Sequence, residues 1–159
     1  LPTSPSFKFL NYLMKIFNFF KTRKKINFIT KHVSYGSLDK LLTNNLDNNI
    51  FLKIDIEGSE YRLLEEIIKH EEKFIGLIIE FHNADIHKKI IHDFCIRFNL
   101  KLTHIHSCNC GQVDANGDPL VFELTFEKDP KIIGEHPKIP NKLDMKNNPK
   151  KQDIQLIFN

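Results

Sequence analysis

The sequence predicts an α/β domain in which helices pack against a mostly parallel sheet. Short apolar runs typical of buried strands alternate along the chain with segments whose apolar residues recur at helical spacing. One run, residues 50–56, leads into a tight turn at Gly58 and then into a helix, which is the order of a βα unit. The turn signal Asn116-Gly117 precedes the last clear strand and predicts that this strand runs antiparallel.

Composition supports a single globular domain. The chain has 159 residues, of which 41% are hydrophobic and 27% are charged. Its net charge of +3 is too small to indicate a nucleic-acid partner. Three cysteines do not make a disulfide framework, so we expect a reduced, cytoplasmic setting. No apolar run reaches the ~20 residues that a membrane-spanning helix needs.

The first 33 residues are predicted to form a segment separate from the domain at 34–159. Residues 7–20 are rich in phenylalanine, with polar residues at helical spacing, and a basic run follows at 21–25. This pattern predicts a helix with a wide apolar face. That face suits either contact with a membrane surface or packing against a sheet or a partner chain, including a second copy in a homo-oligomer. The protein is then cytoplasmic, or membrane-associated if this segment binds lipid.

The remaining elements follow from their apolar patterns. The expected helices and strands are, in order, a strand at 26–29, a helix at 37–42, a strand at 50–56, a helix at 60–71, a strand at 74–81, a helix at 83–98, strands at 100–106 and 120–127, and a last strand at 153–158. Ser59 is placed to cap the second helix. The third helix is expected to bury Ile86, Ile90, Ile91, Phe94 and Phe98. Residues 129–151 are rich in proline and lack periodicity, so we expect irregular structure there.

Polar pairs mark the ends of three successive strands. Residues two apart on a strand point to the same side, and the carboxyl ends of parallel strands share one edge of the sheet, where ligands bind. We therefore expect the three pairs to converge on one site. The pairs are Asp55 with Glu57, Glu80 with His82, and His104 with His106. An edge this acidic suits a hydroxyl group or a cation better than a phosphate.

His82 has two interpretations. A histidine near its ordinary pKa can act as a general base toward an attacking hydroxyl. It can equally be a structural histidine bonded to a carboxylate such as Glu80. The sequence contains no glycine-rich phosphate loop and no Gly-x-Ser-x-Gly nucleophile motif to favour another chemistry.

A metal site is a further alternative at the same edge. His104, His106, Cys108 and Cys110 alternate as four soft ligands, although paired cysteines in zinc sites are usually spaced by two residues or more. The acids around Asp55 and His82 offer harder ligands for a divalent ion. We assign no metal ligands from the sequence.

Five segments, taken together and in order, resemble FkbM-type methyltransferases. They are Leu38-Asp-Lys-Leu-Leu42, Leu52-Lys-Ile-Asp-Ile-Glu-Gly-Ser-Glu60, Ile78-Ile-Glu-Phe-His82, His104-Ile-His106 and Phe122-Glu-Leu-Thr-Phe126. The second segment is the most specific. The tail, with Leu143-Asp-Met, Asn148-Pro149 and Asp153-Ile, also resembles the carboxyl end of some members. The resemblance runs from about Ser34 to the end of the chain.

The resemblance implies a Rossmann-like class I methyltransferase fold whose last strands include one antiparallel member. It implies S-adenosylmethionine as methyl donor and a hydroxyl of a sugar or small molecule as acceptor. Carried onto this chain, the cofactor cleft would be lined by Asp55, Glu57, Gly58 and Glu60. The reacting hydroxyl would face His82, His104 and His106. Glu80 and Asn109 are the candidate acceptor-binding residues.

One part of the family pattern is missing. Such a fold needs a glycine-rich turn after its first strand and an acidic residue after its second. Residues 1–33 contain neither, and no glycine at all. We therefore expect a partial fold whose methyl transfer depends on a cofactor-binding half supplied from elsewhere. The alternatives are a non-catalytic domain that binds a partner or a membrane, and a metal-binding module that uses the His and acid edge.

Overall fold

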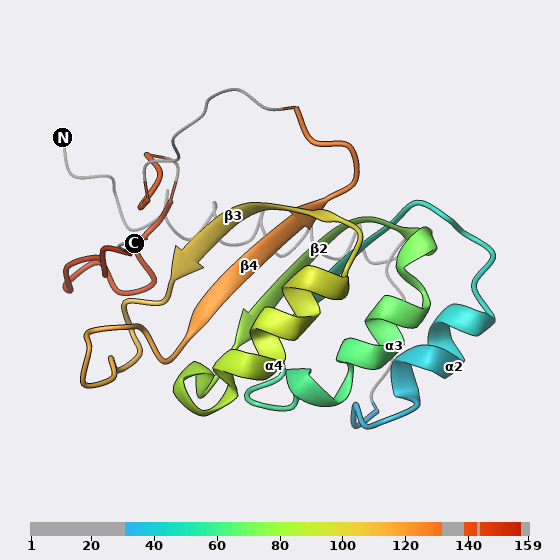
Figure 1. The fold of residues 1–159 in the computed structure, drawn as a ribbon, viewed down its shortest axis with the longest axis horizontal. Helices are drawn as coiled ribbons and strands as arrows, with labels where there is room; N and C mark the ends of the chain where they lie inside the picture. Colours follow the sequence, from blue (N-terminus) through green and yellow to red (C-terminus); the bar gives the residue numbers. More distant parts are fainter. Residues whose placement is uncertain (1–30, 132–138, 143, 157–159) are drawn as a thin grey trace, which may run out of the picture. The chain divides into compact units, whose positions relative to one another are not determined.

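The computed structural model describes residues 31–131, 139–142 and 144–156 (Figure 1). The chain divides into two units, Leu1–His32 and Val33–Asn159, and every helix and strand given below belongs to the second. The predicted phenylalanine-rich helix, the basic run after it and the strand at 26–29 lie outside the described residues.

The centre of the second unit is a four-stranded mixed sheet with the order β1-β2-β4-β3. Its strands are β1 (Ile50–Ile54), β2 (Phe74–Phe81), β3 (Lys101–Ser107) and β4 (Phe122–Glu127). β1 is parallel to β2, and β4 is antiparallel to both β2 and β3, so β1, β2 and β3 run in one direction. The predicted α/β class is confirmed. The prediction that the strand at 120–127 runs antiparallel is confirmed as well, since β4 does so.

The expectation of a mostly parallel sheet is not confirmed. Among the described strands, only the β1–β2 pair is parallel, because β4 inserts between β2 and β3 and pairs antiparallel with each. The predicted last strand is also absent from the described part of the tail, since residues 153–156 form no strand.

Three α-helices lie on one face of this sheet (Figure 1). They are α2 (Ser37–Thr43), α3 (Leu64–Lys69) and α4 (Ala84–Arg97), with short 3₁₀ turns η2 (Glu60–Arg62) and η3 (Glu71–Lys73) on either side of α3. The single helix expected at 60–71 is therefore divided. Ser59 makes no side-chain capping hydrogen bond, so its predicted role was wrong.

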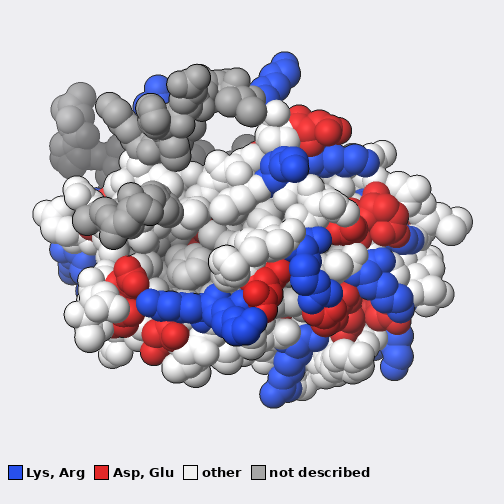
Figure 2. Space-filling view, in the orientation of Figure 1, with Lys and Arg blue, Asp and Glu red and all other residues white. Residues whose placement is uncertain are grey.

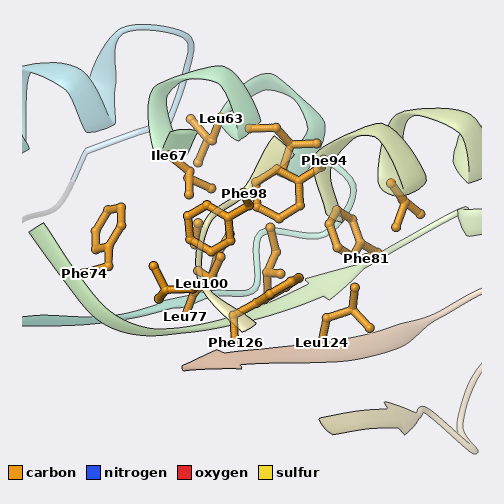
Figure 3. Close-up of a cluster of buried hydrophobic side chains, with 14 of the residues drawn as sticks. Leu63, Ile67, Phe74, Leu77, Phe81, Phe94, Phe98, Leu100, Leu124 and Phe126 are labelled. Atoms are coloured by element: carbon orange, nitrogen blue, oxygen red, sulfur yellow. The ribbon is translucent and has the colours of Figure 1, made fainter. Parts of the chain in front are cut away.

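The hydrophobic core fills the space between the helices and the sheet (Figure 3). Phe126 of β4 is fully buried and packs edge-on against Phe94 and Phe98, with ring centroids 5.7 and 5.3 Å away. Burying one such side chain contributes about 1.5–3 kcal/mol. The prediction that Ile86 and Ile90 join this core was wrong, because both are exposed. At 3.6 residues per turn they lie more than a right angle away from the buried Ile91.

The opposite face of the sheet carries the polar side chains. Lys53 of β1 reaches Glu123 of β4 at 2.8 Å, and Glu80 and His106 are both register partners of Glu123. Phe51 lies against this face over Gly76, where a Cβ would come within 2.6 Å of its ring. Glu80 and His106 therefore lie on the side of the sheet that the described helices leave uncovered.

Candidate functional site

The polar pairs predicted at the strand ends lie at one edge of the sheet, because β1, β2 and β3 share a direction. The structure divides them into two groups. In each group the potential metal-ligating atoms lie within 4.8 Å of one another. The first group is Asp55, Glu57 and His82, and the second is His104, His106 and Asp144. The three strand ends share one edge of the sheet as expected, but His82 belongs to a different group from the two histidines of β3.

The turn after β1 is built around a buried carboxylate. Glu57 and Gly58 have φ values of 54° and 97°, in the left-handed region that favours glycine. Glu60 is fully buried, and its Oε1 accepts the backbone N–H groups of Ile56 at 3.2 Å and Gly58 at 3.0 Å. These two hydrogen bonds hold the turn in its strained shape, which explains why an acid occupies this apolar position.

The same carboxylate holds His82, which directly follows β2. Glu60 Oε1 lies 3.0 Å from His82 Nδ1, and a carboxylate only accepts, so we assign the ring proton to Nδ1. His82 Nε2 faces the acidic edge. It lies 3.3 Å from Glu57 Oε2 and 3.9 Å from Glu80 Oε1. The His82 side chain is 15% exposed, so the ring is mostly enclosed.

The backbone of His82 is fixed by Tyr61. The Tyr61 hydroxyl donates a 2.6 Å hydrogen bond to the His82 carbonyl oxygen. Burial, and then the charge of Glu60, raises the pKa of Tyr61, so the hydroxyl keeps its proton and stays a donor. Asn83, the next residue, has a φ of 53°. The imidazole is thus positioned through both its ring and its backbone, which is what a catalytic base requires.

Negative charge gathers beside His82 on the uncovered face. Burial, followed by the neighbouring Asp55, raises the pKa of Glu80. Lys53 supplies the facing positive charge, and its hydrogen bond to Glu123 raises the pKa of Lys53. Glu57 is 85% exposed at the rim. The edge therefore attracts hydroxyl groups and cations and repels phosphate.

The second group brings in a residue that the sequence did not single out. His104 Nε2 lies 2.8 Å from Asp144 Oδ1, and His106 Nδ1 lies 3.8 Å from Asp144 Oδ2. Asp144 belongs to the tail and is 40 positions from His104. The sequence feature that includes Asp144 is the tail motif Leu143-Asp-Met, and the family resemblance assigns this motif no role in the site. The predicted set with Cys108 and Cys110 does not form among the described residues, because β3 ends at Ser107 and the alternation stops.

Asn109 holds the tail in place. Its side chain is buried; Nδ2 donates to the carbonyl of Asn148 at 3.0 Å, and Oδ1 accepts the N–H of Asn148 at 2.7 Å. Ser107 Oγ adds a 2.9 Å bond to the carbonyl of Ile154. The structure gives the Asn109 amide this structural task, and its predicted role in acceptor binding stays a prediction.

Comparison of the chain with family models, curated proteins and solved structures gives no match. Within the described ranges, no helix combines the length and apolar character needed to cross a membrane. The function must therefore be argued from the geometry of the site and from the motifs of the sequence.

Proposed function

We propose that the unit at Val33–Asn159 is the acceptor side of an S-adenosylmethionine-dependent O-methyltransferase of the FkbM type. The observation that carries this proposal is the Glu60–His82 pair at the carboxyl edge of β1 and β2. The antiparallel β4 supports it as well, because the family resemblance implies one antiparallel member among the last strands. On this proposal the sheet is part of a larger Rossmann-like class I methyltransferase fold.

His82 is the base in this proposal. S-adenosylmethionine, when bound, supplies a methyl group made electrophilic by a sulfonium centre. His82 Nε2 would take the acceptor's hydroxyl proton as the methyl group passes to oxygen and its bond to sulfur breaks, which would leave a neutral thioether. Glu60 Oε1 holds the Nδ1–H and stabilises the imidazolium that forms, as a carboxylate does behind a histidine base. Glu57 and Glu80, 3.3 and 3.9 Å from Nε2, add to this stabilisation.

The described residues fit the acceptor and the sulfonium better than the rest of the cofactor. Carboxylates at Asp55, Glu57 and Glu80 bind hydroxyl groups and attract a cation. Among the described residues ahead of β1, Gly36 is the single glycine, and it lies at the start of α2. No glycine-rich turn for the methionine part is found there. The proposal therefore assigns proton abstraction and acceptor binding to this unit, in line with a cofactor half supplied from elsewhere.

The first test is calorimetric titration of the full chain with S-adenosylmethionine. Because Asp55, Glu57 and Glu80 attract the sulfonium even without the cofactor half, we expect weak binding that is detectable as heat at millimolar ligand and is retained in His82→Gln. Transfer of a labelled methyl group to a panel of sugars should fall about 10²- to 10⁴-fold in His82→Gln, the usual contribution of a general base. His92→Gln, at an exposed histidine of α4, is the matched control and should leave both unchanged. Absence of heat at millimolar ligand would contradict the assignment of the sulfonium to this carboxylate edge.

The alternative roles in binding a partner or a membrane surface depend on residues 7–25. These residues lie outside the described ranges, so those roles stay predictions. The metal-binding alternative is supported by a specific group of side chains and is treated next.

A further inference from the structure

We infer that His104, His106 and Asp144 form a binding site for one divalent transition-metal ion of the zinc class. Imidazole nitrogen suits zinc, copper, iron and nickel, and zinc also accepts carboxylate oxygen. The inference does not depend on methyl transfer, because no hydrogen bond or ion pair of the three residues joins them to the Glu60–His82 pair within the described ranges.

The spacing of the ligand atoms fits a single ion. Zinc binds histidine nitrogen and carboxylate oxygen at about 2.0–2.2 Å, so two ligands of a tetrahedral site lie roughly 3.4 Å apart. The observed separations are 2.8 Å from His104 Nε2 to Asp144 Oδ1 and 3.8 Å from His106 Nδ1 to Asp144 Oδ2. The atoms of the three residues all lie within 4.8 Å of one another. Binding one ion requires the longer separations to shorten and His104 Nε2 to give up the proton that it shares with Asp144 Oδ1.

The β3 strand fixes the two histidines on the same side. His104 and His106 are two positions apart, and they pair in register with Thr125 and Glu123 of β4. The register shifts between Leu102 and His104, an irregularity directly before the pair. Irregularities of this kind re-aim the side chains that follow and are common beside functional sites. A regular strand segment with two histidines on one face presents two ligands with little conformational freedom to lose.

A second layer of hydrogen bonds orients the ligands. His106 Nε2 lies 3.0 Å from Asn147 Oδ1; an amide oxygen accepts, so we assign the proton to Nε2. His106 Nδ1 then carries the lone pair that a metal needs, and Nδ1 is the atom nearer Asp144. Asp144 Oδ2 in turn accepts the N–H of Asn141 at 2.6 Å. Metal-binding histidines nearly always donate their other ring N–H to such a partner.

The tail is anchored tightly enough to deliver Asp144. Asn109 binds the backbone of Asn148, and Ser107 binds that of Ile154; both lie beyond Asp144 in the tail. The Asp144 side chain is 12% exposed, and those of His104 and His106 are 30% and 17% exposed. An ion can therefore enter from solvent and meet ligands that have already lost much of their water. Three protein ligands leave a fourth position for water.

The competing interpretation is a plain ion pair, in which Asp144 serves only as hydrogen-bond partner to the histidines. Equilibrium dialysis of the full chain against Zn²⁺ distinguishes a metal site from a plain ion pair. We expect one ion per chain, and Co²⁺ in the same site should give the visible absorption of a low-coordinate nitrogen and oxygen site. Asn147→Ala should weaken zinc binding about 10- to 100-fold, the usual effect of losing an outer-layer partner.

Asp144→Asn is the sharper variant, since it keeps the shape of the side chain and removes its charge. We expect zinc binding to weaken at least as much as in Asn147→Ala, with the far-ultraviolet circular dichroism unchanged. If Asp144→Asn does not fold, zinc binding by Asn147→Ala and the cobalt spectrum of the unmodified chain decide whether the three residues bind a metal ion.

Two controls locate the site. The double change His92→Gln with Asp93→Asn removes an exposed His–Asp pair of α4, 3.5 Å apart, and should leave zinc binding unchanged. His82→Gln tests the other group and should also leave it unchanged. The inference is overturned if the chain binds no stoichiometric zinc, if Asn147→Ala and a folded Asp144→Asn bind it as the unmodified chain does, or if binding is lost in His82→Gln instead.

Discussion

Glu60 is the residue on which the first group of the site depends. One of its oxygens accepts three groups, the N–H of Ile56, the N–H of Gly58 and the ring of His82, while the other, Oε2, is buried without a hydrogen-bond partner in the described structure. Burying a carboxylate costs free energy, and an unpartnered oxygen adds to that cost. Such a cost is more often found at functional sites than elsewhere.

Replacing Glu60 by alanine removes all three hydrogen bonds at once. We expect Glu60→Ala to lower the free energy of unfolding by about 2–4 kcal/mol, since two backbone N–H groups lose their acceptor inside the protein. Urea unfolding measures this loss. Glu57→Gln changes an exposed neighbouring acid and should alter stability by no more than about 0.5 kcal/mol. Equal losses in the two variants would contradict the structural role of Glu60.

Glu80 should make stability depend on pH in the opposite sense from most acids. Its pKa is raised by burial and by Asp55, so the folded chain binds a proton more tightly at this carboxyl than the unfolded chain does. The ionised Glu80 therefore opposes folding at neutral pH, and this effect disappears as the pH falls below the ordinary glutamate pKa of about 4.3.

The corresponding variant is Glu80→Gln. We expect it to be more stable than the unmodified chain at neutral pH, with a difference that shrinks steadily as the pH is lowered toward 4.3, about the ordinary glutamate pKa. Urea midpoints measured at several pH values give the comparison. A difference independent of pH would show that the carboxyl charge is not its cause.

At the scale of elements, α2 takes its cap from another helix. Gly36 precedes α2 with a φ of 78° and has no side chain to cap it. Glu66 of α3 does so instead, accepting the N–H of Gly36 at 2.5 Å and the N–H of Asp39 at 2.7 Å. A carboxylate at this end also interacts favourably with the helix dipole. This contact is a principal link between the two helices.

Glu66→Ala should therefore loosen α2 specifically. Hydrogen bonds to a charged group contribute about 1.5–3 kcal/mol, and we expect a loss of this size. Amide hydrogen exchange should accelerate in Ser37–Thr43 and much less in β2. Glu72→Gln, at an exposed acid in η3, is the control and should change neither. Unchanged exchange in α2 would mean that its cap lies elsewhere.

The elements that the sequence predicted best are those with strong local patterns. β2 is a continuous apolar run, and its predicted range matches the observed Phe74–Phe81. α4 was placed correctly because Ile91, Phe94 and Phe98 recur at helical spacing and are buried. The division of α3 from η2 was missed, because it arises where Glu60 turns back to bind the preceding turn, a contact that periodicity does not report.

At the scale of the whole molecule, local sequence patterns do not predict contacts between segments that are far apart in the sequence. Alternation in residues 120–127 predicted a strand, and the turn before it predicted its direction. Its place between β2 and β3 depends on pairing partners far away in the sequence. The same limit applies to the site. The carboxylate expected to bond His82 was Glu80, whereas the structure places Glu60 there. Asp144 was not expected near His104, because tail contacts such as those of Asn109 bring it there.

Charges of both signs are interspersed over the face that carries the helices (Figure 2). Several are paired across elements: Asp39 with Lys69 and Glu65 with Arg97. Hydrogen bonds from Lys69 and then His70 lower the pKa of Asp39, and those from Arg97 lower the pKa of Glu65. Each contributes stability that is present above the ordinary pKa of the acid and is lost as the pH falls through the lower, folded-state pKa.

Acid should consequently weaken the whole unit. We expect the free energy of unfolding to decline below about pH 4, where ordinary Asp and Glu groups titrate, and to keep declining further down. Asp39→Asn should flatten this decline. Asp47→Asn, at an exposed aspartate, should leave its slope as it is. Superimposable acid profiles for Asp39→Asn and the unmodified chain would contradict the contribution of this pair.

The most direct measurement of the central claim is the long-range ¹H–¹⁵N spectrum of the His82 imidazole in the full chain. We predict that Nδ1 of His82 carries a proton bonded to Glu60. We also predict that S-adenosylmethionine shifts the His82 Nε2 signal. A proton found on Nε2 instead, or a His82 spectrum unchanged by millimolar S-adenosylmethionine, would contradict the account.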